Sequence, residues 1–261
     1  MNNLHGTQNS RIVTLRQRLL VAMDYIVFCY QNINEKYSKS NFIATSKHNR
    51  FEDFLKYKLV DDYLNQDSQK RKFKDKTVKT VKTLETLSFF SETIKVYQDS
   101  SKQEGENKND IFVQVKPINT TKSWEEDDDE ITDKKKILGT IATQNEAWLQ
   151  IECKILDGKS SQNTAYIDDI FKFCERSYKY EYQPFAGLIA FVNAKTDMKE
   201  HHTKINTALS KRKDIVTVQT LQTFTIRTGF EYSYQSIHKH RLKHNMDLYH
   251  VFLDYSDILT S

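Results

Sequence analysis

The stretch Ala147–Asp157, AWLQIECKILD, constrains the fold more than any other part of the chain. Its apolar residues lie too close together for one stripe of a helix, and this predicts a buried strand of a sheet core. Two opposite charges, Glu152 and Lys154, stand within it. Side chains two residues apart in a strand point to the same face, so the two charges lie side by side in an apolar element. Burying them is costly unless a function requires it.

Metal-assisted hydrolysis of a phosphodiester would require such a pair. A carboxylate can hold Mg²⁺, and an ammonium two residues on can orient a water or stabilise charge at the phosphate. The alternative is an ordinary ion pair on a strand. The chemistry also needs a second acid on a neighbouring strand. Asp110 is available, because it opens NDIFVQVKPI, in which apolar and polar residues alternate up to Pro117 as in a half-buried strand.

Asp110, followed on a later strand by Glu152 and Lys154, resembles the D...ExK signature of the PD-(D/E)XK nucleases, the restriction endonuclease-like superfamily. The resemblance covers about residues 105–195. It includes a helix-like segment from Tyr166 to Phe173 and an apolar strand Phe185–Val192, as in the family's αβββαβ core. The chain departs from the family at two points. Asp110 and Glu152 are 42 residues apart, longer than the family's usual hairpin connection, and Asn109 replaces the Pro that precedes the Asp.

The resemblance implies a role for each of these residues. Asp110, Glu152 and the backbone carbonyl of Cys153 would bind Mg²⁺, for which Mn²⁺ can substitute, and Lys154 would position the attacking water. Glu52 resembles the glutamate that many members of the superfamily bring to the metal from an early helix; the alternative is a surface glutamate. The implied activity is metal-dependent hydrolysis of DNA, in a setting of restriction or phage defence that could include a partner protein. The alternative is a catalytically inactive nuclease fold that binds nucleic acid or protein.

The predicted fold class is α/β, with a central mixed sheet flanked by helices and a restriction endonuclease-like core with N-terminal helical elaboration. The 261 residues show no linker, so we expect one domain: N-terminal helices over about 10–97, the D...ExK core over about 105–195, and strands and a helix over about 196–261. Residues 1–9 are polar and expected to be disordered, and the first helix is expected to begin at the N-cap Ser10 and to end near Asn32. A second helix is expected over Asn49–Leu64, with Glu52 beside its apolar stripe.

Two basic runs are candidates for contact with DNA phosphates. Gln69–Lys82 has seven Lys or Arg residues, among them Lys70, Arg71, Lys72 and Lys74, and His238–His244 includes Lys239 and Arg241. The alternatives are a solvated loop and helix start for the first run and a charged connection between strands for the second. The net charge of +4 permits nucleic-acid binding without arguing for it. The acidic run Glu125–Glu130 lacks the alternating ligands of a calcium loop and is expected to be a solvated insertion.

The remaining patterns concern the C-terminal part and the setting of the protein. Met198–Lys211 is expected to be a helix on which Glu200, His201 and His202 are exposed, and the expected strands are Ile215–Leu221, Thr223–Phe230 and Leu248–Tyr255. Three cysteines without a CxxC pair indicate buried free thiols. The apolar stretch Leu19–Tyr30 is too short to cross a bilayer and follows no secretory leader, so we expect a cytoplasmic protein without membrane contact. One D...ExK centre cuts one strand, and we therefore expect a homodimer on duplex DNA.

Overall fold

The computed structural model describes residues 3–38, 51–78, 111–115, 147–175, 183–193 and 197–260. Asp110 and the acidic run Glu125–Glu130 lie outside the described residues. The helices are α1 (Asn3–Gln31), α3 (Phe51–Leu59), the π-helical turn η1 (Val60–Leu64), α4 (Asp67–Val78), α8 (Ser160–Glu175) and α9 (Met198–Leu209). The strands are β1 (Tyr37–Ser38), β2 (Ile111–Val115), β3 (Ala147–Leu156), β4 (Phe185–Val192), β5 (Thr217–Thr223), β6 (Ser233–Lys239), β7 (Asn245–Asp254) and β8 (Leu259–Thr260).

In the described part of the chain, six strands form one mixed sheet in the order β2-β3-β4-β7-β6-β5. The three central strands β3, β4 and β7 are parallel, and β2, β6 and β5 join by antiparallel ladders. Parallel neighbours need a long crossover, which α8 supplies between β3 and β4. β1 and β8 form a separate parallel pair. The expected α/β class with a helix-flanked mixed sheet is therefore confirmed, and so are the helix after the Glu152 strand and the strand Phe185–Val192.

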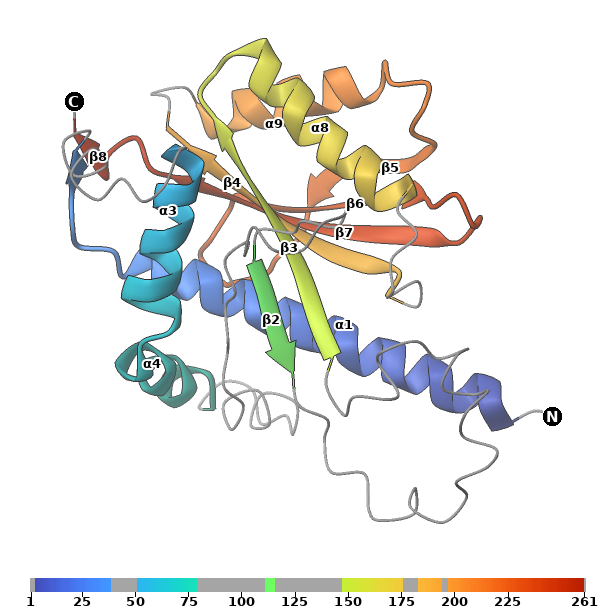
Figure 1. Ribbon diagram of the computed structural model, residues 1–261, viewed down its shortest axis with the longest axis horizontal. Coiled ribbons are helices and arrows are strands. Elements are labelled where there is room, and N and C mark those ends of the chain that lie inside the picture. The colour runs from blue at the N-terminus through green and yellow to red at the C-terminus, as the bar shows by residue number, and fades with distance from the viewer. Residues whose placement is uncertain are drawn as a thin grey trace, which may run out of the picture.

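Helices cover both faces of the sheet (Figure 1). α1 lies on one face and buries Leu19 and Met23 against it, while α8 and α9 lie on the other and contribute Tyr166 and Ile170. β4 is buried along its whole length, as expected of a strand with helices on both sides. Gly187 on β4 permits close packing of α1, because a Cβ at this position would lie 2.9 Å from the Sδ atom of Met23.

Some predicted boundaries are wrong. α1 begins at Asn3, although residues 1–9 were expected to precede it. Thr223–Phe230 is not a strand beyond its first residue: after β5, Phe224 and Ile226 pack against the α1 core cluster, the chain turns at Gly229 with a positive φ, and β6 starts only at Ser233. The basic run Gln69–Lys82 lies in α4 up to Val78, and its last residues lie outside the described part of the chain. The three cysteines are buried free thiols, as predicted. None of the described helices is long and apolar enough to cross a membrane.

Candidate active site

The second half of β3 extends beyond the ladder that joins it to β2. That ladder ends where Ile111 pairs with Ile151, whereas the ladder with β4 continues from Ile151 to Leu156. Glu152 and Lys154 therefore lie where β3 has a described strand on one side only. Asp110, which is the residue before Ile111, lies outside the described residues.

Glu152 and Lys154 lie on the face of β3 that is covered by α8. Leu156, two residues further along the same face, packs with Tyr166 and Ile170 of α8. Glu152 is only 4% exposed, and the Lys154 side chain is 22% exposed. The opposite face of the strand, with Ile151 and Cys153, belongs to the apolar core under α1. An acid and a base thus occupy one buried patch of an otherwise apolar strand.

Glu52 reaches this patch from the first turn of α3. Its Oε1 atom lies 3.6 Å from Nζ of Lys154, and its Oε2 atom accepts a hydrogen bond from the backbone N–H of Ile155 at 3.2 Å. Phe54 and Leu55 are fully buried and fix this end of α3 on the core. An acid in the first turn also suits the positive end of the helix dipole. The structure therefore places Glu52 in the site and not on an open helix surface.

Asp169 of α8 completes the cluster and was missed from sequence. Its carboxylate is 1% exposed, with Oδ2 3.1 Å from Nζ of Lys154 and Oδ1 accepting a hydrogen bond of 2.7 Å from Lys172. A signal was present, because Asp169 falls between Tyr166 and Phe173 in the stripe of α8 that faces the sheet. An acid inside an apolar stripe calls for a buried counter-charge.

The backbone of Cys153 also faces the outer edge of β3. The N–H of Ile155 points to this edge, since it donates to Glu52, and backbone groups two residues apart in a strand point to the same side. The carbonyl of Cys153 is directed the same way, while its thiol is buried in the core. The Cys153 carbonyl and the Glu52 carboxylate therefore both lie at this edge, and oxygen is the ligand atom that Mg²⁺ prefers. Among the described residues, no group of three or more His, Cys, Asp or Glu side chains is arranged to hold a metal ion.

The predicted DNA-binding residues lie away from this cluster. Arg71, Lys72 and Lys74 are exposed on α4, and Lys70 is partly exposed and lies 3.7 Å from Asp67. Figure 1 shows α4 beyond the end of α3 that is remote from β3. Lys239 and Arg241 belong to the hairpin between β6 and β7, at the end of the sheet opposite to the C-terminal ends of β3 and β7.

His201, which was expected to be exposed, is buried, and so are two histidines of the second basic run, His238 and His240. His201 is 0% exposed because it falls in the inward stripe of α9 with Met198 and Ile205. His238 and Lys239 end β6, so the run His238–His244 begins within a strand and connects two strands only from His240 on. Burial lowers the pKa of His201 from its ordinary value and lowers the pKa of His238 to about 4.

His238 belongs to a line of hydrogen bonds over the face of the sheet under α8. Tyr166 Oη lies 2.8 Å from Nδ1 of His250, Nε2 of His250 lies 2.8 Å from Ser236 Oγ, and Ser236 Oγ lies 2.8 Å from Nε2 of His238. The line ends at Thr217, 3.2 Å from Nδ1 of His238. A serine hydroxyl has one proton, so it donates to one histidine and accepts from the other, which both imidazoles can satisfy when neutral.

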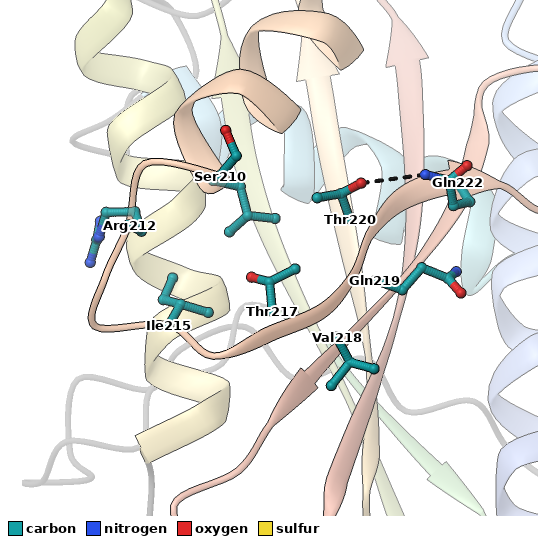
Figure 2. Close-up of a pocket in the computed structure, with 9 residues that line it drawn as sticks. Ser210, Arg212, Ile215, Thr217, Val218, Gln219, Thr220 and Gln222 are labelled. Atoms are coloured by element: carbon teal, nitrogen blue, oxygen red, sulfur yellow. Dashed lines mark hydrogen bonds between the residues drawn. The ribbon is translucent and has the colours of Figure 1, made fainter.

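Thr217 also lines a pocket of about 540 Å³ at the outer edge of β5 (Figure 2). The other lining groups are hydroxyls, amides and apolar side chains of β5 and of the connection from α9, together with Arg212. Arg212 is already paired with Asp214 and Asp168. None of the predicted site residues lines this pocket. Its lining contains no carboxylate, and its one charged residue, Arg212, is paired with two aspartates.

Comparison with protein-family models, with curated proteins and with solved structures found no match to this chain.

Proposed function

We propose that the protein is a metal-dependent endonuclease that hydrolyses phosphodiester bonds of DNA on a restriction endonuclease-like core. The observation that carries the proposal is the cluster of Glu152, Lys154 and Glu52 at the outer half of β3. The three residues were selected from sequence for this chemistry, and the Lys154 ammonium lies 3.6 Å from Glu52, a residue 102 positions earlier in the chain. The order of β3, α8 and β4 is also the one that the resemblance implies.

The metal would be Mg²⁺, with Mn²⁺ as a substitute, held by Glu152, the carbonyl of Cys153 and Asp110. Asp110 is included because of its place in the sequence. It directly precedes Ile111, and Ile111 pairs with Ile151, the residue before Glu152. Glu52 and Asp169 both lie near the Lys154 ammonium, and Asp169 also pairs with Lys172. A bound divalent cation would activate a water and neutralise charge at the phosphate.

The protein's own groups have separate tasks in this proposal. The Lys154 ammonium donates to the attacking water and to a phosphate oxygen. Glu52 and Asp169 restrict the ammonium from two sides. Exposed bases on α4 and the hairpin residues Lys239 and Arg241 would contact the phosphate backbone. Because one centre cuts one strand, we propose a homodimer on duplex DNA, located in the cytoplasm and serving restriction or phage defence with a partner protein.

A second candidate is a nuclease fold that binds nucleic acid or protein without catalysis. The observation in its favour is that the buried carboxylate of Asp169 needs Lys154 as a counter-charge, which explains the lysine without chemistry. If Lys154 is catalytic, the purified protein cleaves DNA only with a divalent metal. If Lys154 only balances the charge of Asp169, the purified protein does not cleave DNA.

Cleavage of supercoiled plasmid and of labelled duplex, single-stranded DNA and RNA tests the proposal. Each substrate is incubated with protein in Mg²⁺, in Mn²⁺ and in excess chelator. We expect cleavage with either metal, none with chelator, and a loss of at least about 10²-fold in Glu152→Gln and Lys154→Met. Lys211→Met is the matched control, because this exposed lysine lies outside the cluster. Cleavage that persists in chelator, or that Glu152→Gln leaves intact, contradicts the assignment, whereas binding without any cleavage favours the second candidate.

A further inference from the structure

Asp169 is a buried carboxylate whose two oxygens have different partners. Oδ1 accepts a hydrogen bond from Lys172, one turn along α8, whose side chain is half exposed. Oδ2 is buried and makes no hydrogen bond of normal geometry among the described residues; it lies 3.1 Å from Nζ of Lys154. An exposed pair within one helix contributes little, so the contact with Lys154 is the one that justifies burying this acid.

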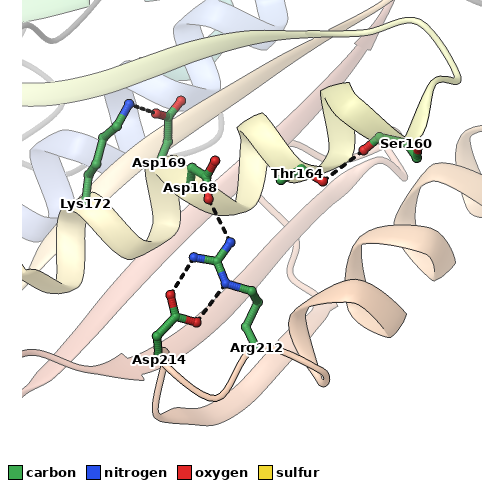
Figure 3. Close-up of polar contacts among 7 residues, drawn as sticks. All are labelled: Ser160, Thr164, Asp168, Asp169, Lys172, Arg212 and Asp214. Atoms are coloured by element: carbon green, nitrogen blue, oxygen red, sulfur yellow. Dashed lines mark hydrogen bonds and ion pairs between the residues drawn. The ribbon is translucent and has the colours of Figure 1, made fainter.

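The preceding residue, Asp168, has a different partner, so the contact with Lys154 belongs to Asp169 and is not shared by neighbouring acids of α8. Its carboxylate accepts a hydrogen bond of 2.7 Å from Arg212, and Arg212 also binds Asp214 through two further hydrogen bonds (Figure 3). Figure 3 shows Asp168 and Asp169 pointing from α8 in different directions. Asp168 is therefore a second acid on the same helix that makes no contact with the strand.

Lys154 is restricted by carboxylates that come from two different helices. Glu52 approaches from α3 at 3.6 Å and Asp169 approaches from α8 at 3.1 Å. A lysine side chain has four rotatable bonds and loses much entropy when it is fixed, so one charged neighbour seldom holds it in a single place. Glu52 also accepts the Ile155 N–H, which ties that carboxylate to the strand edge. Asp169 is the shorter contact and the more deeply buried one.

We propose that Asp169 is a positioning residue that fixes the Lys154 ammonium beside Glu152. The inference rests on the proposed nuclease function and adds to it a residue that acts only through Lys154, without contact with substrate or metal. Its loss leaves the binding of DNA intact and lowers the rate of the chemical step, because a displacement of about 1 Å at a catalytic group can cost about 10²-fold.

The test is a double-mutant cycle between Asp169→Asn and Lys154→Met, with Asp168→Asn as the matched control. Single-turnover cleavage of duplex DNA is measured in Mg²⁺, duplex affinity is measured by anisotropy in Ca²⁺, and folding is measured by urea unfolding. We expect Asp169→Asn to reduce the cleavage rate constant by about 10²-fold with duplex affinity changed less than about twofold. In the Lys154→Met background the same change is expected to have no further effect. Asp168→Asn is expected to cleave within about twofold of the unsubstituted chain.

Three outcomes overturn the inference. A cleavage rate unchanged in Asp169→Asn removes Asp169 from the reaction while leaving the proposed function standing. Losses that multiply in the double variant show that Asp169 acts independently of Lys154. Absence of metal-dependent cleavage by the unsubstituted chain overturns the proposed function, and this inference with it.

A second variant and a crystal structure keep the proposal testable if Asp169→Asn fails to fold. Asp169→Glu keeps the negative charge and moves it by one methylene, so it is expected to fold and still to lose at least about fivefold in rate. If Asp169→Asn does not fold, an unchanged rate in Asp169→Glu refutes the proposal. A crystal structure of Asp169→Asn is expected to show Nζ of Lys154 displaced from its position beside Glu152, and an unmoved Nζ counts against it.

Discussion

Mild acid is expected to destabilise the fold through His238. This side chain is 0% exposed, and both ring nitrogens lie within hydrogen-bond distance of hydroxyl groups, Ser236 on one side and Thr217 on the other. Removal from water disfavours the charged imidazolium, and burial lowers the pKa of His238 to about 4 from an ordinary 6.5. His250, joined to it through Ser236, has a pKa that burial also lowers well below its ordinary value.

The direction of the effect follows from which state binds the proton first. Between pH 6.5 and about 4 the unfolded chain carries a protonated His238 and the folded chain does not, so acidification favours unfolding. The stabilisation is complete above pH 6.5 and is lost as the pH falls toward 4. A pKa difference of this size corresponds to about 3 kcal/mol, since each unit contributes about 1.4 kcal/mol. That is a large part of the roughly 5–15 kcal/mol that stabilises a typical domain.

Two acids, the partly buried Asp24 and the buried Asp247, act in the opposite direction. Burial raises the pKa of Asp24 and of Asp247 above their ordinary value. The folded chain binds protons at these two groups before the unfolded chain does, so they favour folding as the pH falls. The stability curve of one protein therefore mixes both effects, and His238 is isolated only by comparison with a variant.

The measurement is urea unfolding at pH 7.5, 6.5, 5.5 and 4.5, followed by circular dichroism, for the unsubstituted chain and for His238→Gln. Glutamine can keep a hydrogen bond to Ser236 and does not titrate. From pH 7.5 to 4.5 the unsubstituted chain is expected to lose about 2–3 kcal/mol more of its unfolding free energy than the variant. His244→Gln, in the hairpin turn outside the hydrogen-bonded line, is the control. Parallel curves for His238→Gln and the unsubstituted chain refute the reasoning.

Three further predictions concern packing, the sheet edge and DNA. Gly187→Ala is expected to lower the unfolding free energy by about 1–3 kcal/mol in urea, because the added Cβ meets Met23 Sδ at 2.9 Å and Ile151 Cγ1 at 3.0 Å; an unchanged midpoint would show that α1 shifts freely. Asn206→Ala is expected to cost about 1–2 kcal/mol, since the Asn206 amide accepts from the N–H and donates to the C=O of Leu221 on the edge strand; Asn206→Asp, which keeps the acceptor, should cost less. Changing Arg71, Lys72 and Lys74 to Gln is expected to weaken duplex binding and to reduce the slope of log affinity against log salt by about 2–3, and an unchanged slope excludes α4 from the interface.

The elements that were predicted correctly have strong local signals. β3, β4 and α8 show dense apolar runs or a clear helical stripe, and such patterns do not depend on distant contacts. The segment after β5 shows the limit of this reasoning. Phe224 and Ile226 have the spacing of a strand, yet they pack against the α1 cluster from a turn-containing segment. Spacing alone does not reveal which partner buries a residue.

In the candidate site, too, some features follow from local sequence and others depend on tertiary contacts. The adjacency of Glu152 and Lys154 follows from the period of a single strand and needs no tertiary information. The approach of Glu52 depends on how the first turn of α3 meets the open half of β3, which no local pattern encodes. Asp169 is intermediate, because its place in the buried stripe of α8 could be read from sequence while its partner on β3 could not.

The distances between the basic residues and the candidate site restrict the size of any ligand that contacts both. Lys154 is level with Phe252 of β7 across the parallel ladders, and Lys239 pairs with Asn245 at the other end of that strand. Seven residues of strand separate these levels by about 23 Å. From Glu52 to Leu64 the chain of α3 and η1 rises by about 18 Å, and Lys70 follows on α4. A mononucleotide is too small to contact the site and either basic region together, whereas a duplex contacts such distances within roughly one helical turn. If these residues act as one surface, the ligand is therefore an extended polymer.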